Sequence, residues 1–161
     1  MQRDTSTIPP TEYGIPAGAR PITPDPRSEV FQTDAGVFIG HRYRQAGFGH
    51  RVCQIYCDSR EWDTSAYPRD FFDSVLIDGG HSEDVVLSDT RKALSVTRPG
   101  GLVMWHDFCP DPAVFDACPS VIGVISSLTS HWPELASKLR DVFWVRPSFL
   151  LVGVRGDERQ R

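Results

Sequence analysis

Two short apolar segments in the middle of the chain each end in an acidic residue with a histidine close by. These are residues 74–77, followed by Asp78 and His81, and residues 102–105, followed by His106 and Asp107. Between them, residues 83–97 carry apolar side chains at helical spacing and charged side chains elsewhere. This order predicts two parallel strands joined by a crossover helix, which places the carboxyl ends of both strands at one edge of a sheet. Asp78 and Asp107 are therefore expected to open onto one crevice.

The length of 161 residues suits one domain with a modest core. Six of the 13 prolines fall between Pro9 and Pro26, where large apolar residues are few, so residues 1–29 are expected to form an extended arm. The α/β domain is expected to span residues 30–155, and residues 156–161 to form a charged tail.

The net charge of −4 and the lack of a lysine- or arginine-rich run argue against a nucleic-acid partner. No apolar stretch is long enough to span a membrane, and the N-terminus lacks the apolar region of a secretion signal. A cytoplasmic protein without a membrane partner is the default expectation.

Other segments predict the rest of the secondary structure. Helices are expected near residues 41–47, 121–131 and 133–139, a strand over 51–56, a sharp turn at 98–101, and strands over 142–145 and 149–154. The last two flank Arg146-Pro147-Ser148, so they are expected to form an antiparallel hairpin.

The four cysteines show no metal-binding spacing, and we favour buried free thiols over a disulfide for Cys53, Cys57, Cys109 and Cys118.

Residues 73–82 (DSVLIDGGHS) and 98–107 (RPGGLVMWHD) resemble, in order and spacing, the C-terminal part of class I S-adenosylmethionine-dependent methyltransferases. The closest likeness is to a small-molecule and sugar O-methyltransferase-like group, over roughly residues 30–155. It implies a Rossmann-like sheet, here strands three to seven of seven, closed by the antiparallel hairpin. The chain is expected to be truncated at the N-terminus, because Gly14 to Gly18 lack the strand and helix that flank a cofactor-binding glycine loop.

The resemblance also implies cofactor contacts. Asp58 and Ser59 are similar to the position that meets the adenine amino group, and Asp78 and Gly79 to the turn beside the cofactor. Capping of a turn by Asp58 and Ser59 is the alternative.

Asp78 and Asp107 are candidates to share a cation such as Mg²⁺, which prefers hard oxygen ligands. The alternative is that Asp78 hydrogen-bonds the glycine-rich turn and Asp107 caps the following loop. His81 and His106 are candidate general bases, because imidazole titrates near neutral pH, and a structural role for each stays open. His106-Asp107 also matches the histidine–aspartate pair of metal phosphohydrolases, but those pairs lie on helices.

The sequence thus predicts methyl transfer from S-adenosylmethionine to an oxygen of a sugar or small-molecule acceptor, with the enzyme positioning both reactants. The alternative is a non-catalytic methyltransferase-like remnant. Such a protein would bind a partner chain or a second copy through the sheet edges that the absent strands leave open.

Overall fold

The structure is a computed structural model that describes residues 40–55, 57–115 and 118–157. The chain divides into two units, Met1–Asp58 and Ser59–Arg161, each described by itself. The predicted arm, most of the predicted tail and the glycine cluster of residues 14–18 lie outside the described residues, and the domain limits stay predictions.

In the first unit, helix α1 spans His41–Gln45 and a 3₁₀ turn, η3, spans Gly49–Arg51. The sequence predicts a helix here, and Gly47, with a φ of 78°, follows its end. The strand expected over residues 51–56 is wrong: Arg51 ends η3, and Val52–Ile55 form neither helix nor strand. A strand forms only where a neighbour completes its hydrogen bonds, and among the described residues no strand pairs with this segment.

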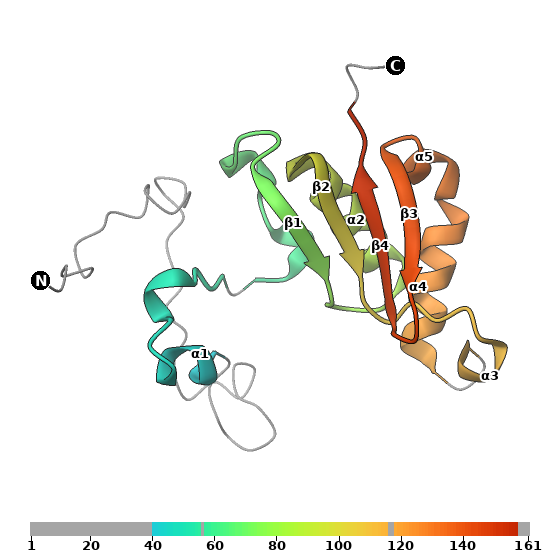
Figure 1. The fold of residues 1–161 in the computed structure, drawn as a ribbon, viewed down its shortest axis with the longest axis horizontal. Coiled ribbons are helices and arrows are strands. Elements are labelled where there is room, and N and C mark those ends of the chain that lie inside the picture. The colour runs from blue at the N-terminus through green and yellow to red at the C-terminus, as the bar shows by residue number, and fades with distance from the viewer. Residues whose placement is uncertain (1–39, 56, 116–117, 158–161) are drawn as a thin grey trace, which may run out of the picture. The chain divides into compact units, whose positions relative to one another are not determined.

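The second unit contains the sheet (Figure 1). In chain order, its elements are η4 (Ser59–Glu61), η5 (Thr64–Ala66), β1 (Phe72–Ile77), α2 (Glu83–Val96), β2 (Thr97–Trp105), α3 (Pro112–Phe115), α4 (Pro119–Ser130), α5 (Trp132–Ala136), β3 (Leu139–Val145) and β4 (Leu150–Arg155). The predicted crossover helix and hairpin are confirmed. The last predicted helix is shorter than expected, because Leu139 already begins β3.

The four strands lie in the order β1-β2-β4-β3, with β1 parallel to β2 and β4 antiparallel to both of its neighbours. This confirms the α/β class, the parallel pair and the antiparallel hairpin, whereas the seven-stranded Rossmann-like arrangement stays a prediction. The carboxyl ends of β1 and β2 point to the edge at which the β3–β4 hairpin turns (Figure 1).

The turn expected at residues 98–101 is an irregularity inside β2. The pairing passes from Phe72 opposite Thr97 to Ser74 opposite Leu102, so residues 98–101 face Asp73 alone. Gly100, with a φ of 76°, adopts the left-handed backbone that this bulge requires. Glycine and proline thus form a bulge within β2, and the pairing with β1 resumes at Leu102.

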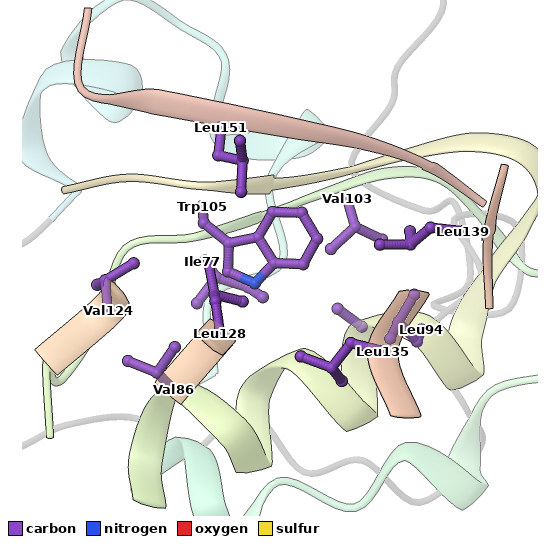
Figure 2. Close-up of a cluster of buried hydrophobic side chains, with 11 residues drawn as sticks. Ile77, Val86, Leu94, Val103, Trp105, Val124, Leu128, Leu135, Leu139 and Leu151 are labelled. Carbon is purple, nitrogen blue, oxygen red and sulfur yellow. The ribbon is translucent and has the colours of Figure 1, made fainter. Parts of the chain in front are cut away.

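The core lies between one face of the sheet and helices α2, α4 and α5, with Trp105 at its centre (Figure 2). Its members are Ile77, Val86, Ala93, Leu94, Val103, Trp105, Val124, Leu128, Leu135, Leu139 and Leu151. Burial of each large apolar side chain contributes about 1.5–3 kcal/mol. Helices α2, α4 and α5 cover this one face, and none of the described helices has the length and apolar character needed to cross a bilayer.

The opposite face of the sheet keeps large apolar side chains exposed. Leu76 on β1 is 54% exposed and Phe143 on β3 is 49% exposed, and Leu102 and Val145 also face outward. We call these four residues the uncovered face. Within residues 59–157 no helix lies over it.

Candidate active site

The turn after β1 presents Asp78 at the edge of the sheet. Gly79 and Gly80 follow it, and a Cβ atom on Gly80 would lie 3.1 Å from Val85 on α2, so the turn packs closely against the start of that helix. Asp78 itself is exposed. The strand therefore delivers this carboxylate to solvent at the end where parallel strands of open α/β sheets bind ligands.

The end of β2 brings two further groups to the same edge. The backbone N–H of His106 donates to the carbonyl oxygen of Ile77 at 3.0 Å, so the strand pairing continues one residue past β2. Asp107 then adopts a φ of 56°, a left-handed conformation that is uncommon for residues other than glycine. This conformation turns the chain out of the sheet and into the loop that leads to α3.

Four predicted site residues meet here. One ligand atom each of Asp78, His81 and Asp107 lies within 4.8 Å of the others. The Nδ1 atom of His106 is 3.3 Å from an Oδ1 atom of both Asp78 and Asp107. We call these four residues the acidic cluster. The predicted convergence of the two strand ends is confirmed, whereas the chemical roles of these residues stay predictions.

The contact between His81 and Asp107 is unusually close. The Nε2 atom of His81 lies 2.5 Å from Oδ2 of Asp107, yet this shielded nitrogen atom makes no hydrogen bond within the described residues. A nitrogen lone pair and a carboxylate oxygen repel each other at this distance unless a proton or a cation neutralises them. A proton on His81 satisfies this contact. The donor set of two carboxylates and an imidazole is also of the kind that binds a small divalent cation.

The space beside the acidic cluster is small. The cavity bounded by the ends of β1 and β2 and by α4 has a volume of only about 10 Å³. Within the described unit, a substrate-sized molecule can therefore approach the cluster only from its exposed side. Asp107 is the least exposed carboxylate of the cluster, at 18%.

A glycine on α4 supports the cluster from behind, and sequence reasoning did not identify it. A Cβ atom on Gly123 would collide with the backbone carbonyl group of His81. The helix can lie this close to the turn only because residue 123 has no side chain.

Cys118, directly before α4, also lies within the electrostatic reach of Asp107. A hydrogen bond with the Ser120 hydroxyl lowers the pKa of the Cys118 thiol, and the negative charge of Asp107 opposes that effect. All four cysteines are free thiols. Cys109 is buried as expected, but the expected burial is wrong for Cys53 and Cys57, which lie in a segment with no covering strand.

The remaining predicted cofactor contacts are not part of this cluster in the described structure. Ser59 begins η4, and its carbonyl oxygen accepts a hydrogen bond from Lys92 of α2 at 2.6 Å. Asp58 belongs to the first unit, and no described strand precedes it. Gly79 lies in the turn next to Asp78. The cofactor roles of these residues stay predictions.

A larger cavity, which the sequence did not predict, adjoins the cluster along the chain. It has a volume of about 570 Å³ and lies between residues 109–114 and residues 144–149, where the loop after β2 faces the hairpin turn. We call it the hairpin groove.

Comparison with known families gives one match. The sequence model of a family described as a methyltransferase domain matches residues 19–108. This range includes β1, α2, β2 and all four residues of the acidic cluster. No curated protein matches the chain.

Proposed function

Because the chain belongs to the methyltransferase-domain family, we propose that it is a class I S-adenosylmethionine-dependent enzyme that methylates an oxygen of a sugar or another small molecule. The observation that carries the proposal is the acidic cluster at the carboxyl ends of two neighbouring parallel strands. Ligand sites of open α/β sheets lie at this edge.

In this proposal Asp78 and Asp107 hold a divalent cation, with His81 as a further donor. Mg²⁺ prefers oxygen ligands and binds through one or two carboxylates while it keeps several waters. A cation held there would supply charge stabilisation to an oxygen of the acceptor. The exposed side of the cluster leaves room for the acceptor.

His106 is our preferred general base. Its Nδ1 atom lies 3.3 Å from a carboxylate oxygen of Asp78 and of Asp107, so these contacts can orient the ring while its other nitrogen accepts the proton of the hydroxyl. His81 is the less suitable choice, since its Nε2 atom is shielded and already engaged with Asp107. S-adenosylmethionine, when bound, supplies an electrophilic methyl group to the hydroxyl oxygen that His106 deprotonates.

The described residues support the acceptor side of the reaction more than the donor side. Within residues 40–55, 57–115 and 118–157, no strand precedes β1. By the resemblance, the glycine turn that follows β1 belongs to a later strand than the one whose loop passes under the methionine part of the cofactor. We therefore assign the Asp78-Gly79 turn to donor binding, and donor contacts of Asp58 and of Ser59 stay predictions from the resemblance.

Isothermal titration with S-adenosylhomocysteine and with MgCl₂ tests the proposal on the full chain. We expect both to bind, and Asp78→Asn and Asp107→Asn to weaken Mg²⁺ binding by at least about tenfold. Asp73→Asn is the matched control, because Asp73 lies on β1 but near its other end and pairs with Arg98. Absence of heat with millimolar S-adenosylhomocysteine would remove the cofactor from the proposal.

A second candidate function is a non-catalytic module that binds another protein chain. The uncovered face favours it, as does the outer edge of β1, which pairs with no strand among the described residues, since an apolar sheet face and an unpaired strand edge are common contact surfaces between chains. Size-exclusion chromatography with light scattering tests this candidate. A monomer that stays soluble at high concentration counts against it.

A further inference from the structure

The hairpin groove begins two residues beyond the acidic cluster. Asp107 belongs to the cluster and Cys109 lines the groove. Between them, the backbone N–H of Phe108 donates to the carbonyl oxygen of Phe149 at 3.1 Å and ties the loop to the hairpin. The loop that lines the groove is therefore the one that leaves the end of β2, directly after the acidic cluster.

One wall of the groove is an aromatic side chain held in place. The indole N–H of Trp144 donates to the carbonyl oxygen of Ser148 at 2.5 Å. The ring also meets Phe108 edge to face, with centroids 6.5 Å apart and an interplanar angle of 73°. The indole is thus fixed by a hydrogen bond on one side and by packing on another, so ligand binding need not order it.

The guanidinium group of Arg146 lies over the ring of Trp144. The guanidinium carbon of Arg146 lies 4.6 Å from the centroid of the Trp144 ring. Arg146 forms no ion pair with a carboxylate among the described residues. The acidic residue of the opposite wall, Asp111, accepts a hydrogen bond from the backbone N–H of Ala113 at 3.0 Å. Asp111 lines the same cavity but forms no ion pair with Arg146, so the groove presents a planar, positively charged fork that has no carboxylate partner among the described residues.

We propose that the hairpin groove binds a planar carboxylate, an aromatic acid whose ring lies against the groove's aromatic and proline side chains while Arg146 pairs with the carboxylate. Arginine matches a carboxylate with two parallel hydrogen bonds, and a flat apolar ring suits the remaining lining better than a hydrated sugar does. The claim that this ligand is the methyl acceptor rests on the proposed function. The claim that it binds in the groove is independent of that function.

Ligand-observed NMR and isothermal titration with 4-hydroxybenzoate test the assignment on the full chain. We expect binding that Arg146→Gln weakens by at least about tenfold, the loss typical of a charge-assisted hydrogen bond. Arg146→Lys should fall between the two, because it keeps the charge and loses the planar fork. Arg140→Gln on the same hairpin is the matched control, since Arg140 pairs with Asp141 at 2.6 Å outside the groove.

Two comparison ligands separate the parts of the proposal. 4-Hydroxybenzamide has the same ring without the charge and should bind at least about tenfold more weakly. Inorganic phosphate should not displace the aromatic acid at equal concentration. The assignment is overturned by equal affinity for the amide, by displacement with phosphate, or by an unchanged affinity in Arg146→Gln.

The two proposals fail in different ways. If the chain binds 4-hydroxybenzoate but not S-adenosylhomocysteine, the result contradicts the methyltransferase activity and supports the proposal that the groove binds an aromatic acid. The reverse result, cofactor binding without any 4-hydroxybenzoate signal at millimolar concentration, overturns the groove assignment. Arg146 is exposed, so its substitution is not expected to unfold the protein, and circular dichroism checks this.

Discussion

Trp105 is the residue on which the packing of the sheet against the helices most depends. Its indole N–H donates to the Thr90 hydroxyl at 2.8 Å, and both side chains are buried. We expect Thr90→Val to lower the free energy of unfolding by about 1–3 kcal/mol, because the indole N–H keeps its burial and loses its acceptor. Thr129→Val is the control at an exposed position and should change stability by less than about 0.5 kcal/mol. Equal effects of the two substitutions in urea denaturation would contradict this account.

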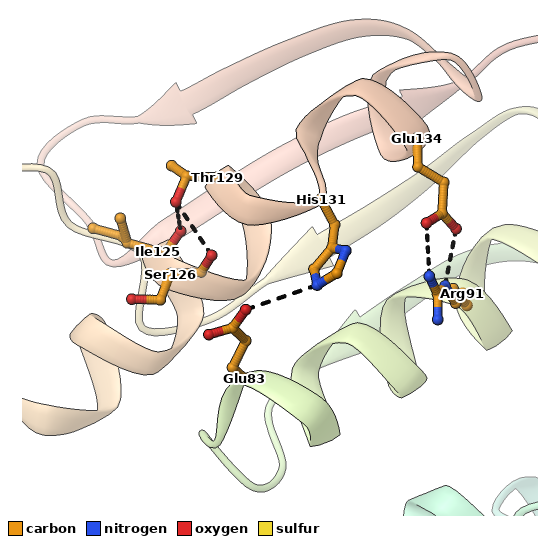
Figure 3. Close-up of polar contacts among 7 residues, drawn as sticks. All are labelled: Glu83, Arg91, Ile125, Ser126, Thr129, His131 and Glu134. Carbon is orange, nitrogen blue, oxygen red and sulfur yellow. Dashed lines mark hydrogen bonds and ion pairs between the residues drawn. The ribbon is translucent and has the colours of Figure 1, made fainter.

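The Glu134 carboxylate makes stability depend on pH. Arg91 on α2 donates to it from Nε at 2.9 Å and from Nη2 at 2.7 Å (Figure 3), and these bonds lower the pKa of Glu134 below its ordinary value of 4.5. A lowered acid pKa stabilises the folded state above the ordinary value, and this stabilisation is lost as the pH falls through the lowered pKa.

We therefore expect Glu134→Gln to be slightly less stable than the natural sequence at pH 7 and equally stable well below pH 4.5. Thermal unfolding measured across this range checks the prediction. High salt should shrink the difference at neutral pH, because both side chains are partly exposed and the charges are screened. A difference that persists unchanged in acid would mean that the substitution disturbs packing and not charge.

At single positions, the sequence predicted the acidic cluster but not the groove. Asp78 and Asp107 follow two neighbouring strands, and the geometry of parallel pairing alone brings such residues together. Arg146 and Cys109 converge only because a hairpin folds against a loop that lies far earlier in the sequence. No pattern within either segment predicts that contact.

Among the elements, α4 offers a direct test of how the site is supported. Gly123→Ala should raise helix propensity by about 1 kcal/mol, but the new methyl group meets the His81 carbonyl group, and such overpacking costs about 1–3 kcal/mol. We expect a net loss of up to about 2 kcal/mol and a displaced His81, visible as weaker Mg²⁺ binding. Ser126→Ala on the same helix is the control and should be neutral or slightly stabilising. If Gly123→Ala is more stable than the natural sequence, the turn at His81 can move away from the new methyl group without loss of stability.

Elements were predictable where their neighbours in sequence are also their neighbours in space. The unit β1-α2-β2 and the β3–β4 hairpin are of this kind, and their periodicity predicts them. Residues 51–55 have the alternating pattern of a strand, yet a strand needs a partner, which the pattern cannot supply. Residues 98–101 have the sequence of a turn but form a bulge. Glycine and proline predict irregular backbone, but they do not predict that β2 continues pairing with β1 at Leu102.

On the scale of the whole molecule, helices α2, α4 and α5 cover one face of the sheet, and the uncovered face lies on its other side. We expect the full chain to self-associate through the uncovered face, and Leu76→Gln with Phe143→Gln to weaken that association by at least about tenfold, since each buried apolar side chain contributes about 1.5 kcal/mol or more. Sedimentation velocity over a concentration series measures this. Thr64→Gln is a control outside the face. The prediction is wrong if the double variant and the natural sequence sediment alike.

The strand order β1-β2-β4-β3 also constrains how synthesis and folding are coupled. A nascent chain that has left the ribosome only as far as Val145 has β3 but nothing to connect it to β2, since the connecting strand, Leu150–Arg155, is translated after both. The hairpin turn, and with it Arg146, therefore reaches its final position only after β4 has been made. Until then, the edge of β2 that pairs with β4 in the finished sheet stays without its partner strand.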